Sequence, residues 1–112
     1  MNPRVQYLSD QFAVAAQLGA SDVPGVAAQG FRTLVNNRPD GEAAGQPGQA
    51  DIEAAARAAG LHYVYLPVIP GAITPDEARA MKQVLSTAPG PVLAFCRSGS
   101  RSANLYSLAL QA

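Results

Sequence analysis

The chain of 112 residues contains one cysteine, one histidine and no tryptophan. A single cysteine excludes an internal disulfide framework and a cysteine-rich metal site. A single histidine excludes a zinc site built on several imidazoles. We therefore expect neither a metal site nor a bound cofactor.

Charged residues are also scarce, at 14% of the chain, and 8 Lys and Arg residues balance 8 Asp and Glu residues. A nucleic-acid binder normally carries a basic excess, so this balance argues against that class. No apolar run approaches the ~20 residues that span a bilayer, and the first residues lack the apolar stretch of a secretory signal. We expect one cytoplasmic domain over residues 1–112, without a membrane partner.

Strand-like and helix-like segments alternate along this chain. Apolar, branched and aromatic runs predict strands at residues 11–17, 31–36, 61–68 and 92–96. Capping and breaker residues predict helices at residues 21–30, 49–59, 74–86 and from 101 to the C-terminus. Ser21 is expected to cap the first helix, and Thr74 and Glu77 form a capping box around Pro75. The alternation predicts an α/β fold with a mainly parallel sheet and helices on both faces.

Two polar segments follow predicted strands, at residues 37–42 and 96–102. Ligands of parallel sheets bind at the carboxyl ends of the strands, so both segments lie on the expected active edge. The second segment reads Cys-Arg-Ser-Gly-Ser-Arg-Ser and joins a buried strand to a helix N-terminus. It carries the only thiol of the chain, Cys96.

The surroundings of Cys96 are expected to lower the pKa of its thiol. A helix N-terminus and successive backbone amides in a glycine-containing turn place partial positive charge near the sulfur. Arg97 and Arg101 add full charges, and Ser102 can donate a hydrogen bond to a thiolate. A cysteine that merely ends an apolar strand would explain Cys96 alone, but not the polar residues that follow it.

The cysteine segment follows a Pro-Val-Leu-Ala strand, and Asn-Asn-Arg-Pro-Asp-Gly-Glu stands upstream at residues 36–42. Together they resemble the beta-lactamase-hydrolase-like, phosphatase-like domain family, over nearly the whole chain from residue 12 to the last helix. Members are bacterial, have a protein-tyrosine-phosphatase-like fold, and occur alone or fused to a metallo-hydrolase domain. The resemblance implies that fold here.

The same resemblance implies a role for each residue of the motif. Cys96 matches the nucleophile, Arg101 the arginine that holds the oxyanion, and Ser102 the hydroxyl that stabilises the thiolate. The backbone that surrounds the oxyanion corresponds to Arg97, Ser98, Gly99 and Ser100.

The length of this loop departs from ordinary tyrosine phosphatases. Those enzymes have five residues between Cys and Arg, whereas this chain has four, and Phe95 stands where they usually carry His. The six-residue loop is more similar to that of rhodanese-type sulfurtransferases, which often reads Cys-Arg-x-Gly-x-Arg-Ser. A persulfide on Cys96 is therefore an alternative to a bound phosphate.

Phosphatase chemistry by this route also needs a general acid. In related dual-specificity enzymes an Asp follows the strand equivalent to residues 61–68, but residues 69–73 here contain no carboxylate. Asp40, with Glu42 beside it, is the better candidate, although a turn at Pro39-Asp40-Gly41 explains Asp40 equally well. Arg38 is expected either to contact an anion or to pair with one of these two carboxylates.

The residues predict a Cys96 thiolate in an anion-binding loop, and the resemblance implies that it serves a cysteine-dependent, phosphatase-like hydrolase. Its substrate would be a small-molecule or protein-borne oxyanion. The first alternative is a rhodanese-type sulfurtransferase that takes a sulfane substrate. The second alternative is a catalytically weak anion-binding module, which needs the loop and Arg101 but no reactive thiol.

Overall fold

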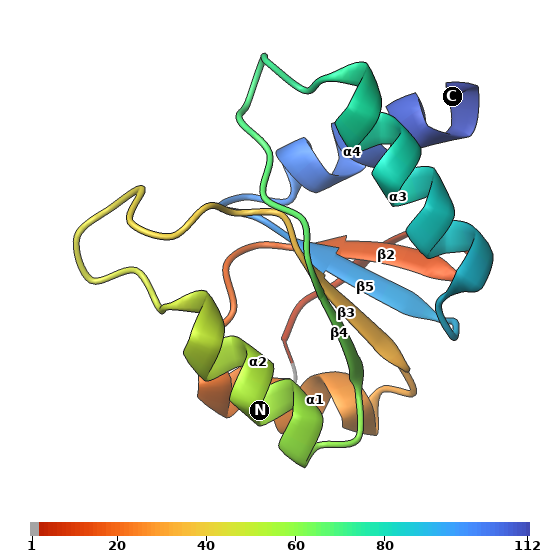
Figure 1. Cartoon of the computed structure of the whole chain (residues 1–112). Helices are drawn as coiled ribbons and strands as arrows, with labels where there is room; N and C mark the ends of the chain where they lie inside the picture. Colours follow the sequence, from red (N-terminus) through yellow and green to blue (C-terminus); the bar gives the residue numbers. More distant parts are fainter. Residues whose placement is uncertain (1–2) are drawn as a thin grey trace.

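The computed structural model describes residues 3–112 and places a five-stranded sheet between two pairs of helices (Figure 1). The strands are β1 (Gln6–Ser9), β2 (Phe12–Ala15), β3 (Thr33–Asn36), β4 (His62–Tyr65) and β5 (Val92–Phe95). Their order in the sheet is β1-β2-β5-β3-β4. The four strands β2 to β5 are parallel, and β1 pairs antiparallel with β2 at one edge.

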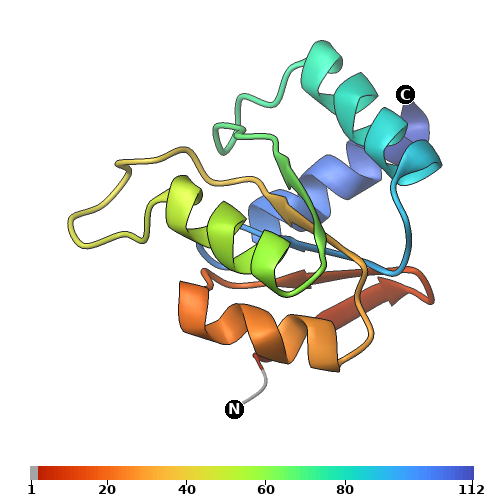
Figure 2. The same ribbon diagram turned by 60° about the horizontal axis from the view of Figure 1, so that its bottom comes forward.

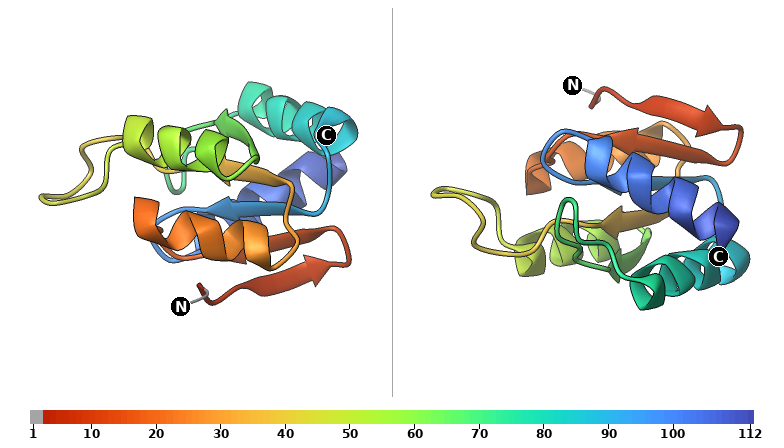
Figure 3. Two further views of the ribbon diagram at one scale, coloured as in Figure 1. Left: turned by 90° about the horizontal axis from the view of Figure 1, so that it is seen from below. Right: turned by 90° about the horizontal axis from the view of Figure 1, so that it is seen from above.

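A short 3₁₀ turn, Ala20–Asp22, precedes the first of four α-helices in the described chain. These are α1 (Val23–Ala28), α2 (Gln49–Ala58), α3 (Pro75–Thr87) and α4 (Ser100–Gln111). Helices α1 and α2 cover one face of the sheet, and α3 and α4 cover the other (Figures 1 and 3). Within residues 3–112, no helix is both long enough and apolar enough to cross a membrane.

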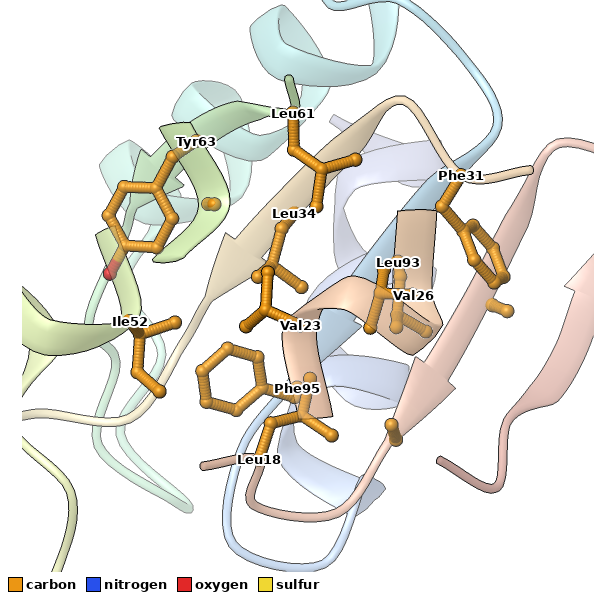
Figure 4. Packing of buried hydrophobic residues seen from close by; sticks show 13 residues of the cluster. Leu18, Val23, Val26, Phe31, Leu34, Ile52, Leu61, Tyr63, Leu93 and Phe95 are labelled. Atoms are coloured by element: carbon orange, nitrogen blue, oxygen red, sulfur yellow. The ribbon is translucent and has the colours of Figure 1, made fainter. Parts of the chain in front are cut away.

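Side-chain alternation along β5 divides the core into two layers. Leu93 and Phe95 pack in the cluster under α1 and α2, which Figure 4 shows around Val23 and Val26. Val92 and Ala94 pack in the opposite cluster with residues of α3 and α4. The next residue in this alternation is Cys96, so its side chain turns toward the α3/α4 side at the carboxyl end of the sheet.

The predicted α/β fold with a mainly parallel sheet and helices on both faces is confirmed. Each of the four predicted strands is present, shortened at its ends, and each predicted helix is represented. The capping box of α3 is also confirmed. Thr74 Oγ1 accepts a hydrogen bond from Glu77 N at 3.1 Å, and Thr74 N donates to Glu77 Oε1 at 2.8 Å.

One expectation at the N-terminal side of the chain is wrong, and one strand there was not predicted. Ser21 does not cap a helix but lies inside the 3₁₀ turn, where the Asp22 carboxylate instead accepts the Gly19 N–H at 2.8 Å. The sequence also gives no sign of β1, because all four of its residues are exposed and show no apolar alternation. The turn to β2, Asp10-Gln11, lacks the glycine or asparagine that typifies a tight hairpin.

The predicted loop between β3 and α2 is the longest irregular segment of the described chain, and it projects beyond the sheet edge in Figure 2. It begins with two buried polar residues, Asn37 and Arg38, directly after Asn36, the buried last residue of β3. Both this loop and the segment after β5 leave the sheet at the carboxyl ends of neighbouring parallel strands. The fold therefore brings the two polar segments of the sequence together.

Candidate active site

Cys96 is the first residue of the turn between β5 and α4, and its side chain is buried. The Gly99 N–H donates a hydrogen bond to the sulfur at 3.0 Å. Gly99 has a φ of 97°, in the left-handed region that a side chain strongly disfavours. Glycine at this position therefore allows the backbone to turn an amide directly toward the thiol.

The pKa of the Cys96 thiol lies below its ordinary value. Burial alone raises this pKa, because it disfavours the charged form. Hydrogen bonds outweigh that effect: the backbone N–H and hydroxyl of Ser102 act on the sulfur, together with the backbone N–H groups of Gly99 and Ser98. The sulfur is thus set up to carry negative charge at the start of α4.

Arg101 is almost fully buried, at 8% exposure, and its guanidinium is held at one edge. Nη1 and Nη2 pair with the two carboxylate oxygens of Glu42 at 2.9 and 3.2 Å, and Nη1 also donates to the Val68 carbonyl at 3.1 Å. Such a two-point arrangement fixes the plane of the guanidinium. Nε is buried and has no hydrogen-bond partner within residues 3–112, so one donor of this cation remains free to serve another acceptor.

Of the two carboxylates that follow Arg38 in the loop, Glu42 is the one that pairs with it. Arg38 is buried and pairs with Glu42, its Nε lying 2.9 Å from Oε1. Its Nη1 donates to Gln17 Oε1 at 3.1 Å, and the Gln17 N–H donates to the Arg97 carbonyl at 3.2 Å. Arg38 therefore holds Glu42 in place. Through Gln17 it also connects Glu42 to the segment that follows β2.

The carboxylate of Glu42 lies between the buried guanidinium groups of Arg38 and Arg101, and both groups favour its ionised form. The hydrogen bond from Arg101 is the largest influence and lowers the pKa of the Glu42 carboxyl below its ordinary value of 4.5. Partial burial raises that pKa, but the hydrogen bond from Arg38 and the charges of both arginines lower it further. A carboxylate held ionised in this way is poorly suited to donate a proton.

Asp40 lies outside this cluster of charged groups, on the exposed part of the same loop. Its Oδ1 accepts the backbone N–H of Gln49, the first residue of α2, at 2.8 Å. Its own N–H donates to the Tyr65 hydroxyl at 3.0 Å. These contacts order the loop and hold it against β4 and α2; the role of Asp40 as general acid stays a prediction.

A cavity of about 260 Å³ opens beside the cysteine turn. Its lining comes from the cysteine turn, the start of α4 and the loop after β4, and consists of Cys96, Arg97, Ser98, Ser100, Arg101, Asn104, Pro70, Gly71 and Ile73. Arg97 is exposed, in contrast to the buried Arg101. No group of three or more His, Cys, Asp or Glu side chains in residues 3–112 is arranged to hold a metal ion.

Sequence reasoning missed two contributors to this site. Gln17 supports Arg38, and Asn37 accepts the Ser102 hydroxyl hydrogen bond at 2.8 Å. Two features of the sequence could have indicated Asn37. It is a polar residue directly after a predicted strand, and it lies within the motif at residues 36–42 that resembles the family. Gln17 follows a strand in the same way, at the same edge of the sheet.

The family model for the beta-lactamase hydrolase-like protein, phosphatase-like domain, matches residues 4–112. The chain belongs to this family. It is 42% identical over 101 residues to the beta-lactamase hydrolase-like protein of Agrobacterium fabrum, a match that covers 90% of this chain and 23% of that protein. The chain thus spans about a quarter of the length of such curated relatives.

Solved structures place the fold among phosphatases. A protein of Neisseria meningitidis Z2491, described as a candidate phosphatase, is 32% identical with a TM-score of 0.83, covering 89% of this chain and 71% of that one. Kinase associated phosphatase, solved with its catalytic site cysteine replaced by serine, has a TM-score of 0.80 at 13% identity and covers 99% of this chain and 74% of that one. At that identity the likeness concerns the fold alone, which is protein-tyrosine-phosphatase-like.

Proposed function

We propose that this phosphatase-like domain is a cysteine-dependent hydrolase of phosphate esters, with the Cys96 thiolate as the nucleophile. The observation that carries this proposal is the position of one buried sulfur that accepts the Gly99 N–H at 3.0 Å and lines a cavity shared with Arg101. A second supporting observation is the buried Nε of Arg101, a donor without a partner in the described chain. A thiolate, backbone amides and an oriented guanidinium are the groups that transfer of a phosphoryl group requires.

The proposed reaction has two steps. In the first, the Cys96 sulfur attacks phosphorus, an S–P bond forms, and the P–O bond to the leaving group breaks with its electron pair on the oxygen. That oxygen then takes a proton from solvent or from an acid. In the second step water attacks phosphorus, the S–P bond breaks, and inorganic phosphate and the thiolate are released.

The residues around Cys96 have distinct proposed roles in these steps. Arg101, aligned by Glu42, holds one oxygen of the phosphoryl group through Nε, and the turn formed by Arg97, Ser98, Gly99 and Ser100 supplies backbone amides to the others. Ser102 stabilises the sulfur when it leaves. The proposed substrate is a small-molecule or protein-borne phosphate ester in the cytoplasm, where a lone thiol stays reduced.

A rhodanese-type sulfurtransferase is the second candidate, and the length of the loop favours it. Only four residues separate Cys96 from Arg101, so the ring of amides is one residue tighter than in ordinary tyrosine phosphatases. A tighter ring suits the terminal sulfur of a Cys96 persulfide, which needs fewer donors and no leaving-group acid. Inserting one glycine after Gly99 is expected to raise phosphatase activity relative to sulfur transfer.

A side-by-side assay of an aryl phosphate and thiosulfate with one protein preparation separates the two candidates. The proposal predicts aryl phosphate hydrolysis that Cys96→Ser abolishes, with no thiocyanate formed from thiosulfate and cyanide. Sulfur transfer without phosphate release would establish the alternative. Binding of phosphate without turnover of either compound would support an anion-binding module instead.

A further inference from the structure

The loop between β4 and α3, residues 66–74, supplies the part of the cysteine cavity wall that belongs neither to the cysteine turn nor to α4. It contributes Pro70, Gly71 and Ile73. The loop runs beside the N-terminal half of α4 (Figures 1 and 3). Residues 66–74 include no charged side chain, so this wall offers apolar contact rather than an acid or a base.

A second cavity, of about 360 Å³, continues the cysteine cavity between the same loop and α4. The two cavities share Gly71, Ile73 and Asn104. The second cavity, here called the α4 groove, is completed by Ser107 and Leu108. None of its five lining residues is charged, so the path from the thiol leads away from the arginines into neutral surroundings.

The helical period explains why α4 lines both cavities. Ser100, Asn104 and Leu108 are spaced four residues apart, so they lie on one face of α4. Ser100 lines the cysteine cavity, Asn104 lines both cavities, and Leu108 lines the α4 groove. With a rise of about 1.5 Å per residue, Leu108 lies roughly 12 Å along the helix axis from Ser100. A molecule held at the cysteine turn therefore reaches Leu108 only if it is elongated.

The two large apolar side chains of the α4 groove are incompletely covered. Leu108 is 40% exposed, and Ile73 is only partly buried against the core cluster under α3 and α4. An exposed leucine on its own needs no explanation. Here the exposed surface continues the cavity that holds the proposed nucleophile, and covering it with an apolar group is favourable.

The direction of attack determines which part of a phosphate ester enters the groove. The leaving oxygen lies on the side of phosphorus opposite the attacking group. In the proposed reaction the cysteine turn and Arg101 hold the remaining oxygens. The ester group therefore points away from the turn, toward the loop residues Gly71 and Ile73, where the α4 groove begins.

We propose that Ile73 and Leu108 form a specificity site that binds the distal end of an elongated, uncharged apolar group on the substrate. This inference rests on the proposed function and names its substrate class, phosphate monoesters of long apolar alcohols or phenols. A two-ring aryl group spans the distance from the cysteine cavity to Leu108. A short ester group occupies the cysteine cavity alone and gains nothing from Leu108.

Binding of two phosphonates to the intact chain tests this proposal without turnover. Phenylphosphonate and biphenylphosphonate carry the same anionic group and differ by one ring, and their P–C bond resists hydrolysis. Isothermal titration calorimetry gives the Kd of each compound. The proposal predicts that biphenylphosphonate binds about tenfold more tightly, because its second ring covers Ile73 and Leu108.

Leu108→Ser tests the residue at the far end of the groove, and its partial exposure favours a folded variant. It is predicted to reduce the preference for biphenylphosphonate to about twofold and to leave the Kd of phenylphosphonate unchanged. Leu110→Ser is the matched control, because Leu110 is on the same helix, is 66% exposed and lines neither cavity. The control should keep the full preference. Equal losses in the two variants, or a full preference in Leu108→Ser, would overturn the proposal.

Methyl NMR spectra of the unmodified chain supply a second measurement if Leu108→Ser does not fold. The ring current of bound biphenylphosphonate is expected to shift the methyl signals of Ile73 and Leu108 more than phenylphosphonate does. The Leu110 signals should stay in place. Shifts at Leu110 as large as those at Leu108 would contradict a site in the α4 groove.

The outcomes separate this specificity site from the proposed function. Equal binding of the two phosphonates would refute the site and leave the hydrolase standing. Binding of neither compound would overturn the site together with the anion-binding loop that the hydrolase requires. A preference for biphenylphosphonate in a protein that hydrolyses no phosphate ester would refute the hydrolase and retain the site.

Discussion

Glu42 and Arg101 are 59 residues apart in the chain, yet their side chains form a two-point ion pair beside the only cysteine. The pair uses the terminal nitrogens of the guanidinium, so Nε is the donor that stays available. Arg38 holds Glu42 from the other side, at 2.9 Å. The orientation of the proposed oxyanion-binding arginine therefore depends on a loop that leaves a different strand.

The two arginines of the cysteine turn are expected to differ sharply in importance. Arg101→Lys replaces a planar group that forms parallel hydrogen bonds with a single ammonium, and Lys cannot satisfy Glu42 and an oxyanion in the same geometry. We expect kcat/KM for an aryl phosphate to fall roughly 10- to 100-fold. Arg97→Lys is the matched control, because Arg97 is exposed, and a much smaller loss is expected. Equal losses at the two positions would refute this division of roles.

Glu42 should make stability depend on pH in the acid range. Its folded-state pKa is lowered, chiefly by the hydrogen bond from Arg101, so the folded state favours the ionised carboxylate. The resulting stability is fully present above the ordinary value of 4.5 and is lost as pH falls through the lowered folded-state value. Urea unfolding at several pH values is expected to show a weaker decline below pH 4.5 for Glu42→Gln than for the unmodified chain.

Glu53→Gln provides the control for that experiment, because Glu53 pairs with Arg57 on an exposed helix surface. Exposed pairs of this kind contribute little to stability. The control should keep the acid decline of the unmodified protein. If Glu42→Gln keeps the same decline as well, the two ion pairs of Glu42 do not stabilise the fold as described.

The backbone conformation of Gly99 directs its N–H toward the Cys96 sulfur, so a change at Gly99 should affect the ionisation of the thiol. Gly99→Ala places a side chain at a φ of 97°, which should destabilise the fold by about 1–2 kcal/mol. Relief of that strain would rotate the N–H away from the sulfur, so the midpoint of Cys96 alkylation should rise. Thermal unfolding and alkylation against pH measure the two effects, and an unchanged midpoint would show that this amide does not stabilise the thiolate.

Asp40 is the predicted general acid, but its contacts favour a role in ordering the loop before α2. Loss of a general acid costs roughly 10²- to 10⁴-fold in rate. Because the Asp40 carboxylate accepts the first N–H of α2, Asp40→Asn is expected to change aryl phosphate hydrolysis by less than about tenfold. Rates measured over a series of leaving groups should keep their steep dependence on leaving-group acidity. A large loss confined to poor leaving groups would identify Asp40 as the acid.

The features that sequence alone predicts are those encoded within a few neighbouring residues. The turn from Cys96 to Ser102 is one continuous motif, and the capping box of α3 spans four residues from Thr74 to Glu77. The alternation of strands and helices likewise follows from local apolar runs. These signals were sufficient for the fold class and for the central thiol.

The parts that could not be predicted depend on contacts between distant segments. Nothing local distinguishes Glu42 from Asp40 as the partner of Arg38, since both follow it within the same turn. Asn37 and Ser102 are 65 residues apart, so their hydrogen bond becomes visible only when β3 and β5 are paired. The edge strand β1 is defined by its pairing with β2 rather than by its own residues.

The central claim is that Cys96 accepts a phosphoryl group, and the covalent state of this residue tests it most directly. The protein is mixed with an aryl phosphate, denatured rapidly, and analysed by intact-mass and peptide mass spectrometry; a parallel sample receives thiosulfate. The account predicts a mass gain of one phosphoryl group on the peptide that contains Cys96, absent from Cys96→Ser. A peptide that stays unmodified with the phosphate but gains one sulfur atom from thiosulfate would contradict the account.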